Sequence, residues 1–411
     1  MIAIRQRRGR YALDGVNFFV AAMQAGFGVF VTVYLVQNGW AAEAVGLALT
    51  LSTVASLASQ LPAGALIDRL GDKRRAVQVG VAGVGVAALL LALSAARPGV
   101  YLAQALQGLA SSLVAPGIAA ISLAAVGHAG LCERIGRNAR FASIGGGLTA
   151  GVMGLAGSYF QPVAIFWLTA VLALPTLLFV SFTGPPRAAR RAEVHAASQE
   201  NESRPSWEGL KRLLHDRRLL VFACCIVLFF AASAALLPGV AARVTRRYPE
   251  FATLIVAGTM LLPQAVTAAI APWVGRKADR AGRRPLLLLG WSLVPLQAVL
   301  YATLAGAYAL PIGLMLNGVS SAVFGVMMTI VAADLTRGTG RFNLTLGAFG
   351  VAIAVGASLS TLLGGLAVAA FGGSAAFLVL ALFGLLGILL LWVGFPETKP
   401  VARDPAITQS A

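Results

Sequence analysis

Gly64-Ala-Leu-Ile-Asp68-Arg69-Leu-Gly71-Asp72-Lys73-Arg74-Arg75 recurs in the second half of the chain as Gly275-Arg-Lys-Ala-Asp279-Arg280-Ala-Gly282-Arg283-Arg284. Asp68 and Asp279 are 211 residues apart, about half of the 411-residue chain. Each copy is a short run of glycine, aspartate and basic residues between two long apolar stretches. The pattern predicts a duplicated membrane protein in which each half carries one such charged loop.

The composition places the chain in a membrane. Hydrophobic residues make up 58% of the sequence and charged residues only 11%, and the mean hydropathy is +0.82. Soluble domains carry roughly 25% charged residues. Nine stretches without Asp, Glu, Lys or Arg exceed about 20 residues, the length of a membrane-spanning helix. They are residues 16–42, 44–67, 76–96, 98–132, 141–186, 219–242, 251–275, 285–333 and 342–396.

Three of these stretches are long enough for two helices each, so the sequence predicts twelve helices. Turns are expected within them at Gln161-Pro162, around Gly306 to Tyr308, and at Gly372-Gly373. One long polar segment separates the first six helices from the last six. We therefore expect an N-terminal six-helix bundle over residues 1–183, a linker over 184–218, and a C-terminal six-helix bundle with a short tail over 219–411.

The positive charges predict the orientation of the chain. Its formal net charge of +17 could indicate nucleic-acid binding, but the distribution of the charges excludes that. With a cytoplasmic N-terminus, all but four of the 32 Lys and Arg residues fall in cytoplasmic segments, including a predicted loop over 134–140. This bias is typical of multi-pass membrane proteins. Abundant Ala and Arg indicate a bacterial source, so we expect an inner-membrane protein with both termini in the cytoplasm.

The two halves also correspond outside the charged loops. Gln107-Gly108 precedes Asn317-Gly318 by 210 residues, and the segment Gly136 to Phe141 is similar to Gly338 to Phe342. On these features the chain resembles the major facilitator superfamily over its whole length. Its signature loop is Gly64-x-Leu66-x-Asp68-Arg69-x-Gly71-x-Lys73-Arg74. The resemblance implies an all-α membrane protein of two pseudo-symmetric six-helix bundles, which moves a small organic solute by alternating access.

A shorter motif, Leu13-Asp14-Gly-Val-Asn17 in helix 1, is similar to one in the drug:proton antiporter branches. It favours proton-coupled efflux of an amphiphilic compound or metabolite. Two features depart from those branches, because Gln104 stands where they usually carry an Arg and helix 5 lacks their Gly-Pro pair. A facilitator or uptake carrier for a neutral metabolite, such as a sugar or amino acid, is one alternative. A non-transporting membrane sensor on the same scaffold is another.

The charged loops are expected to hold the cytoplasmic side shut. Their glycines would let the chain turn tightly, and the resemblance implies that Asp68 meets the positively polarised N-terminus of helix 11 beside Arg341. By pseudosymmetry, Asp279 would meet the start of helix 5 near Arg140. The alternative is that these charges only enforce topology. The predicted gating residues are Gly64, Asp68, Arg69, Gly71, Arg140, Gly275, Asp279, Arg280, Gly282 and Arg341.

Polar side chains inside the predicted helices are few, and in helices 1, 4 and 10 their spacing places them on one helical face. The resemblance implies that helices 1, 4, 7 and 10 line a substrate cavity. The alternative is that these amides join neighbouring helices by hydrogen bonds. The predicted cavity residues are Asn17, Gln24, Gln104, Gln107, Gln264 and Asn317.

No acidic or basic residue lies deep in a predicted span. Asp14, one turn into predicted helix 1, is the candidate for proton coupling, because its apolar neighbours would favour the protonated carboxyl. The alternative is a helix N-cap. Asp334, expected to pair with Arg337 or Arg341, is next in line. The sequence holds no nucleotide-binding loop, catalytic triad or metal-ligand spacing, so we expect no enzymatic activity, cofactor or metal. We expect a monomer in the lipid bilayer.

Overall fold

The computed structural model describes residues 2–27, 29–159, 161–183, 215–248, 252–304 and 308–399. These residues are almost entirely helical, and no strand occurs among them. The long uncharged runs form helices because a helix satisfies its backbone hydrogen bonds internally, which a lipid environment requires. The predicted all-α fold is therefore confirmed. Most of the predicted linker, residues 184–214, and the turn around Gly306 lie outside the described residues.

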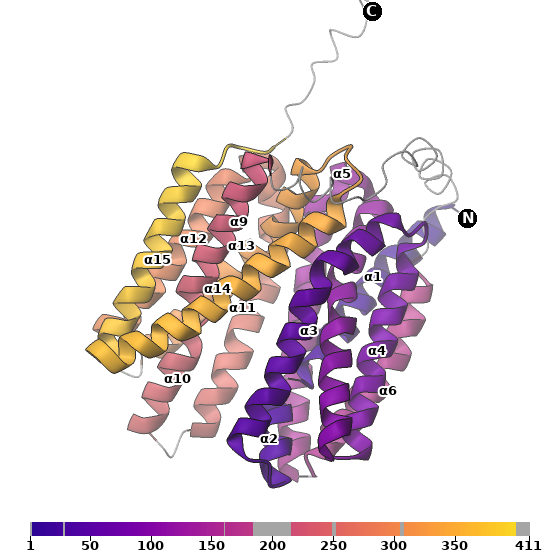
Figure 1. The fold of residues 1–411 in the computed structure, drawn as a ribbon. Coiled ribbons are helices and arrows are strands. Elements are labelled where there is room, and N and C mark those ends of the chain that lie inside the picture. The colour runs from indigo at the N-terminus through magenta and orange to yellow at the C-terminus, as the bar shows by residue number, and fades with distance from the viewer. Residues whose placement is uncertain are drawn as a thin grey trace, which may run out of the picture.

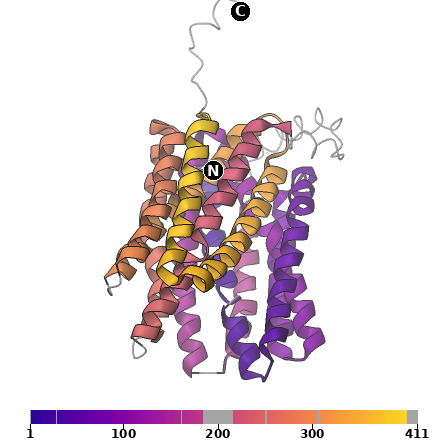
Figure 2. The ribbon, with the colours of Figure 1, turned by 60° about the vertical axis from the view of Figure 1, so that its left-hand side comes forward.

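The helices form two bundles that stand side by side (Figure 1). The N-terminal half contains α1 (Ile2–Ala25), α2 (Val29–Gln37), α3 (Ala42–Arg69), α4 (Lys73–Leu93), α5 (Arg97–Tyr159) and α6 (Val163–Ser181). The C-terminal half contains α9 (Arg217–Ser233), α10 (Leu236–Arg247), α11 (Ala252–Ala281), α12 (Arg284–Thr303), α13 (Ala309–Leu335), α14 (Phe342–Phe371) and α15 (Gly373–Gly394). Figure 2 shows α14 crossing its own half obliquely.

The long element α5 is a helical hairpin. Its backbone leaves the helical conformation at Gly127, where φ is 66° and ψ is −178°. Asn138 donates from Nδ2 to Oγ of Ser122 at 2.7 Å, although sixteen residues of straight helix would separate the two by about 24 Å. The chain therefore reverses at Gly127. We call residues 97–126 helix 4 and residues 128–159 helix 5.

The hairpin corrects the predicted loop over residues 134–140. These residues are helical, and helix 5 begins directly after Gly127. The prediction was wrong because it treated the arginines of this segment as solvated loop charges. Arg134 is instead buried within the bundle, with only 4% of its surface exposed.

Ten segments of the described residues are long and apolar enough to cross a membrane. One of them, Arg97–Met153, holds two helices because of the reversal at Gly127. The thirty-residue α11 is not among the ten, yet it packs closely against α5 and α13. The ten segments therefore do not correspond one to one with the twelve predicted spans. The described residues nevertheless form long apolar helices in both halves.

Both ends of the described chain lie on the same side of the molecule, which we call the terminus side (Figure 1). It carries the α3–α4 turn, the reversal at Gly127, the α11–α12 turn and the start of α14. A hydrophobic cluster centred on Phe222, Trp291 and Phe324 fills the C-terminal half and continues into Leu131 and Ile135 of helix 5. The two halves thus share packed side chains at helix 5.

Candidate functional site

Asp68 of α3 caps a helix of the other half. Its Oδ1 accepts from the backbone N and the Nδ2 of Asn343, at 3.0 and 2.7 Å, and its Oδ2 accepts from the backbone N of Leu344 at 2.8 Å. Because α14 begins at Phe342, these two N–H groups have no acceptor within the helix. A carboxylate here satisfies both donors and faces the positive end of the helix dipole.

The α3–α4 turn holds Asp68 in place. Lys73 donates from Nζ to the carbonyl oxygens of Ile67 and Asp68, at 2.7 and 2.9 Å. Asp72 caps α4 by accepting from the backbone N of Arg74, and it pairs with the Arg74 guanidinium at 2.9 Å. The hydrogen bond from the Arg74 side chain lowers the pKa of Asp72 below its usual range. Lys73 thus binds the backbone carbonyl oxygen of Asp68, and Arg341, predicted to lie beside this helix start, is the N-cap residue of α14.

Two glycines let α3 and α14 approach with their backbones in contact. A Cβ on Gly64 would lie 2.3 Å from the carbonyl oxygen of Asn343, and one on Gly347 would lie 2.4 Å from that of Gln60. Gly64 is thus a close-approach residue inside α3, and its predicted role in a tight turn is wrong. We call the contact of Gln60, Gly64 and Asp68 with α14 the first inter-half contact.

The other predicted residues of the signature loop lie at its exposed edge. Gly71 has open space around it and its φ is not positive, so nothing in the turn requires a glycine there. Arg69 is exposed at the end of α3. Gly282, with φ of 92°, does turn the chain as predicted.

A second contact, between α11 and helix 5, repeats the first residue by residue. A Cβ on Gly275 would lie 2.4 Å from the carbonyl oxygen of Cys132, and one on Gly136 would lie 2.6 Å from that of Ala271. Each of these four positions is 211 residues from its counterpart in the first inter-half contact. We call this set of residues the second inter-half contact.

The second inter-half contact has no carboxylate cap. The counterparts of Asn343 and Leu344 are Cys132 and Glu133, which lie beyond the first turn of helix 5, so their N–H groups are bonded within the helix. The Asp279 side chain is 44% exposed, and its ion-pair partner is Arg283 at 3.9 Å. Arg140 is exposed further along helix 5. The predicted meeting of Asp279 with a helix start near Arg140 is wrong, because matching Arg140-Phe141 to Arg341-Phe342 displaced the alignment.

Arg283 links the second charged loop to α13. It is 5% exposed and donates from Nε to Oδ2 of Asp334 at 2.8 Å and from Nη1 to the carbonyl oxygen of Ala278 at 3.0 Å. The predicted partners of Asp334, Arg337 and Arg341, are replaced by Arg283. The role of Arg283 was not predicted, because a sequence does not show which acid a basic side chain contacts.

Glu397, just after α15, was also missed. It accepts from the backbone N of Arg283 and of Arg284, at 2.8 and 3.0 Å, and so caps α12. Burial would raise the pKa of Glu397, but these backbone donors outweigh it and hold that pKa below its usual range. Lys399 next to it donates from Nζ to the carbonyl oxygen of Arg280 at 3.1 Å, while the Arg280 side chain is exposed.

Asp14 lies inside a helix and is buried. Because α1 begins at Ile2, the predicted N-cap alternative is wrong. Asp14 is 4% exposed, and it pairs with Nη2 of Arg134 and Nη2 of Arg137, both at 2.5 Å. The expectation that basic residues stay in loops fails here, since Arg134 is buried with its partner.

The predicted cavity residues divide into two groups. Gln107 accepts from Ser52 at 2.5 Å and donates to Ser111 at 3.1 Å, and Asn17 donates to the carbonyl oxygen of Leu13 at 2.7 Å. The bond between Ser52 of α3 and Gln107 of helix 4 fits the alternative in which amides join neighbouring helices, while the other two bonds lie within one helix. The remaining four residues, Gln24, Gln104, Gln264 and Asn317, have no side-chain hydrogen bond of this kind among the described residues.

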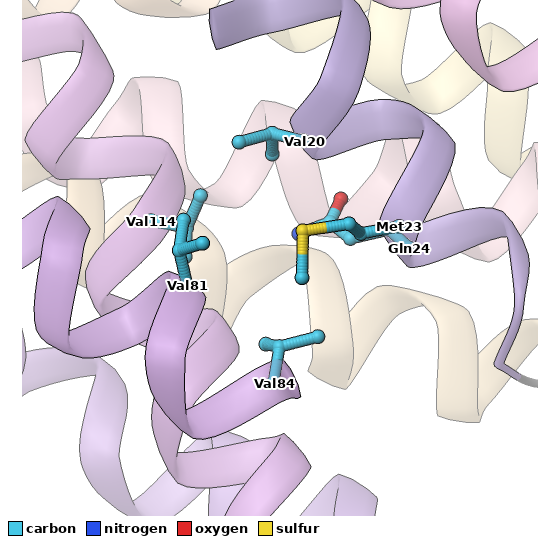
Figure 3. A pocket seen from close by; sticks show the side chains of 6 residues that line it. All are labelled: Val20, Met23, Gln24, Val81, Val84 and Val114. Carbon is cyan, nitrogen blue, oxygen red and sulfur yellow. The ribbon is translucent and has the colours of Figure 1, made fainter. Parts of the chain in front are cut away.

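The four remaining amides differ in exposure. Gln24 and Gln264 are exposed, Asn317 is half-buried, and Gln104 is 2% exposed with an Oε1 that has no hydrogen-bond partner in the described chain. Gln24 borders a small pocket between α1, α4 and helix 4 (Figure 3). The other residues around this pocket are apolar: Val20, Met23, Val81, Val84 and Val114.

The chain is similar to a family of known proteins over nearly all of its length. The family model of the Major Facilitator Superfamily matches residues 13–307 and 249–410. An uncharacterized MFS-type transporter of Mycobacterium tuberculosis is 34% identical over 403 residues, which cover 97% of this chain and 95% of that protein. The class B tetracycline resistance protein of Escherichia coli is 32% identical over 139 residues, 34% of each protein.

A solved structure has the same fold. The human organic anion transporter MFSD10 aligns with a TM-score of 0.73 at 17% sequence identity, covering 94% of this chain and 99% of that one. The predicted resemblance and the two-bundle fold are thus confirmed. The chain belongs to the Major Facilitator Superfamily and is a multi-pass membrane transporter of the secondary type.

Proposed function

We propose that this transporter exports an amphiphilic organic solute, and that the first inter-half contact is its gate on the terminus side. The observation that carries the proposal is the cap that Asp68 provides for α14. Alternating access requires a contact between the halves that is specific and reversible. Hydrogen bonds to a charged group contribute about 1.5–3 kcal/mol each, so the cap is strong enough to favour one state and weak enough to break in each cycle.

The distribution of contacts supports a state that is closed on the terminus side. The two halves approach at Gly64, Gly347, Gly275 and Gly136, all near that side. Away from it, α3 and α14 expose large apolar side chains, including Leu47, Val54, Leu362 and Leu366, each with more than half its surface accessible. Figure 1 shows α3 and α14 meeting at their terminus-side ends.

Two observations favour export of an amphiphilic compound. The tetracycline resistance protein shares part of its sequence with this chain, and the Leu13-Asp14 motif is similar to the antiporter branches. The exposed amides Gln24 and Gln264 carry no charge, which suits a neutral or weakly charged solute. The competing hypothesis is uptake of a neutral metabolite. The proposal also places the protein in a bacterial inner membrane with both termini in the cytoplasm.

Transport in membrane vesicles tests direction and coupling together. Inside-out vesicles with an acidic lumen should accumulate an amphiphilic dye, and collapsing the pH gradient with a protonophore should stop accumulation. The candidate proton-binding residues are Asp14 and Asp334, and because each is paired with arginine here, a proton would bind only in a state of the cycle in which that ion pair is broken. Dye movement that does not depend on the pH gradient would show that the protein is a facilitator and not a proton-coupled transporter. Accumulation only in right-side-out vesicles would reverse the proposed direction.

The cavity amides give a second prediction. Replacing Gln24 or Asn317 by Leu should weaken dye binding, followed by fluorescence, with a change in unfolding free energy below about 0.5 kcal/mol. Gln107→Leu is the matched control. It removes two side-chain hydrogen bonds between or within helices, so stability should fall by roughly 1–3 kcal/mol. If Gln24→Leu and Asn317→Leu behave like Gln107→Leu, these amides join helices and do not contact solute.

A further inference from the structure

The buried ion cluster around Asp14 fixes one face of helix 5. Asp14 accepts from Nη2 of Arg134 at 2.5 Å, and from Nε and Nη2 of Arg137 at 3.0 and 2.5 Å. Arg134 also donates from Nε to Oδ1 of Asn138, and Asn138 donates to Ser122 of helix 4. Helix 5 is thereby tied to α1 and to helix 4 by charged and polar contacts.

The opposite face of the same two turns makes the second inter-half contact. Cys132 presents its carbonyl oxygen to Gly275, and Gly136 lies against the carbonyl oxygen of Ala271. Residues 134, 137 and 138 therefore face the N-terminal half, while residues 132 and 136, interleaved with them, face α11. A small rotation or shift of this segment about its axis would separate backbones that now touch, because such contacts tolerate little displacement.

The C-terminal half contributes apolar packing against Leu131 and Ile135 and a polar bond to helix 5, from Nη2 of Arg283 to Sγ of Cys132 at 3.7 Å. The second inter-half contact lacks the carboxylate cap that orders the start of α14. Its acid, Asp279, is largely exposed and pairs with Arg283 of its own half. The buried ion pairs that orient this segment of helix 5 lie in the N-terminal half, where Asp14 is the anion between two guanidinium groups.

We propose that Asp14 is a positioning residue for the second inter-half contact, which it controls by orienting residues 132–138 of helix 5. In the first inter-half contact an acid reaches across to the other half directly. In the second, Asp14 lies on the side of helix 5 opposite to α11 and acts through Arg134 and Arg137. Without the Asp14 charge, Arg134 and Arg137 would face each other without the anion between them, and helix 5 would shift to separate them. The inference rests on the proposed function only in treating this contact as part of the gate.

Hydrogen–deuterium exchange of the purified full-length protein tests the inference. Asp14→Asn should raise exchange several-fold both in residues 128–138 and in residues 271–281, which Asp14 does not touch. Residues 62–69 and 342–347, in the first inter-half contact, should exchange as in the wild type. Asp14→Glu keeps the charge and should restore much of the protection. Faster exchange confined to residues 128–138 would overturn the inference, since Asp14 would then stabilise helix 5 alone.

Two further variants keep the test decisive. Arg137, whose side chain is 42% exposed, can be replaced by Gln with less risk to folding. Arg137→Gln should raise exchange in the same two segments to a smaller extent, and unchanged exchange in 271–281 would count against the inference even if Asp14→Asn fails to fold. Asp68→Asn should affect only the first inter-half contact. If Asp68→Asn changes nothing there, the proposed gate fails, while the role of Asp14 is still decided by residues 271–281.

Discussion

Asp68→Asn should leave the protein folded while opening its terminus side in a much larger share of molecules. The carboxylate accepts three hydrogen bonds at the start of α14. An asparagine keeps one acceptor, turns an NH₂ group toward a backbone N–H, and removes the charge that faces the helix dipole. A loss of about 1.5–3 kcal/mol is expected, and each 1.4 kcal/mol changes the ratio of closed to open molecules about tenfold.

The reaction of a cysteine at Ser111 with a membrane-impermeant maleimide, added on the terminus side, measures this change. Labelling should be about ten times faster in Asp68→Asn, in a background without the native cysteines. Asp279→Asn is the matched control, because Asp279 occupies the pseudo-equivalent position but caps no helix. Its labelling rate should stay within about twofold of wild type. Equal labelling rates for the two variants would show that Asp68 affects only the membrane topology and not the gate.

Gly64→Ala should have the second large effect, because it adds one methyl group where two backbones touch. The new Cβ would lie 2.3 Å from the carbonyl oxygen of Asn343, so α3 and α14 must separate by about 1 Å to restore ordinary contact. That displacement also lengthens the hydrogen bonds of Asp68 with α14. We expect transport to fall at least about tenfold and the terminus side to stay open, at a cost of roughly 1–3 kcal/mol to the closed state.

Gly71→Ala is the control for this prediction. Gly71 belongs to the same charged loop, has open space around it and does not have a positive φ. Its replacement should leave transport and maleimide labelling near wild type, since exposed substitutions of this kind usually change stability by less than about 0.5 kcal/mol. If Gly64→Ala transports as well as Gly71→Ala, the two backbones do not need to touch during the cycle.

The duplicated loop and the long uncharged runs were enough to predict the fold, because lipid restricts the chain to helices and duplication restricts how the helices are grouped. The placement of Asp68 at the start of α14 was predicted from the resemblance to the family, and the sequence itself supplies only the helix start, where Phe342 follows a run of glycine, threonine and arginine. These features are local in the sequence or repeat within it.

The contacts that could not be predicted depend on where helix 5 begins. Sequence patterns placed its start near Arg140, whereas the chain reverses at Gly127. Because helix 5 starts earlier than predicted, the N–H groups near Asp279 are already bonded within the helix, and Arg134 lies inside the bundle. The partner of Arg134, Asp14, is 120 residues away in the chain. A buried arginine and a loop arginine look alike in a sequence, because only the partner distinguishes them.

The two halves are expected to separate and rejoin at the first inter-half contact during transport. The distance between spin labels at Gly71 and Thr339, both exposed beside that contact, tests it most directly by double electron–electron resonance. We expect a short distance in the wild-type protein and a second, longer distance that becomes prominent in Asp68→Asn. A single short distance in wild type, Asp68→Asn and Gly64→Ala alike would contradict it.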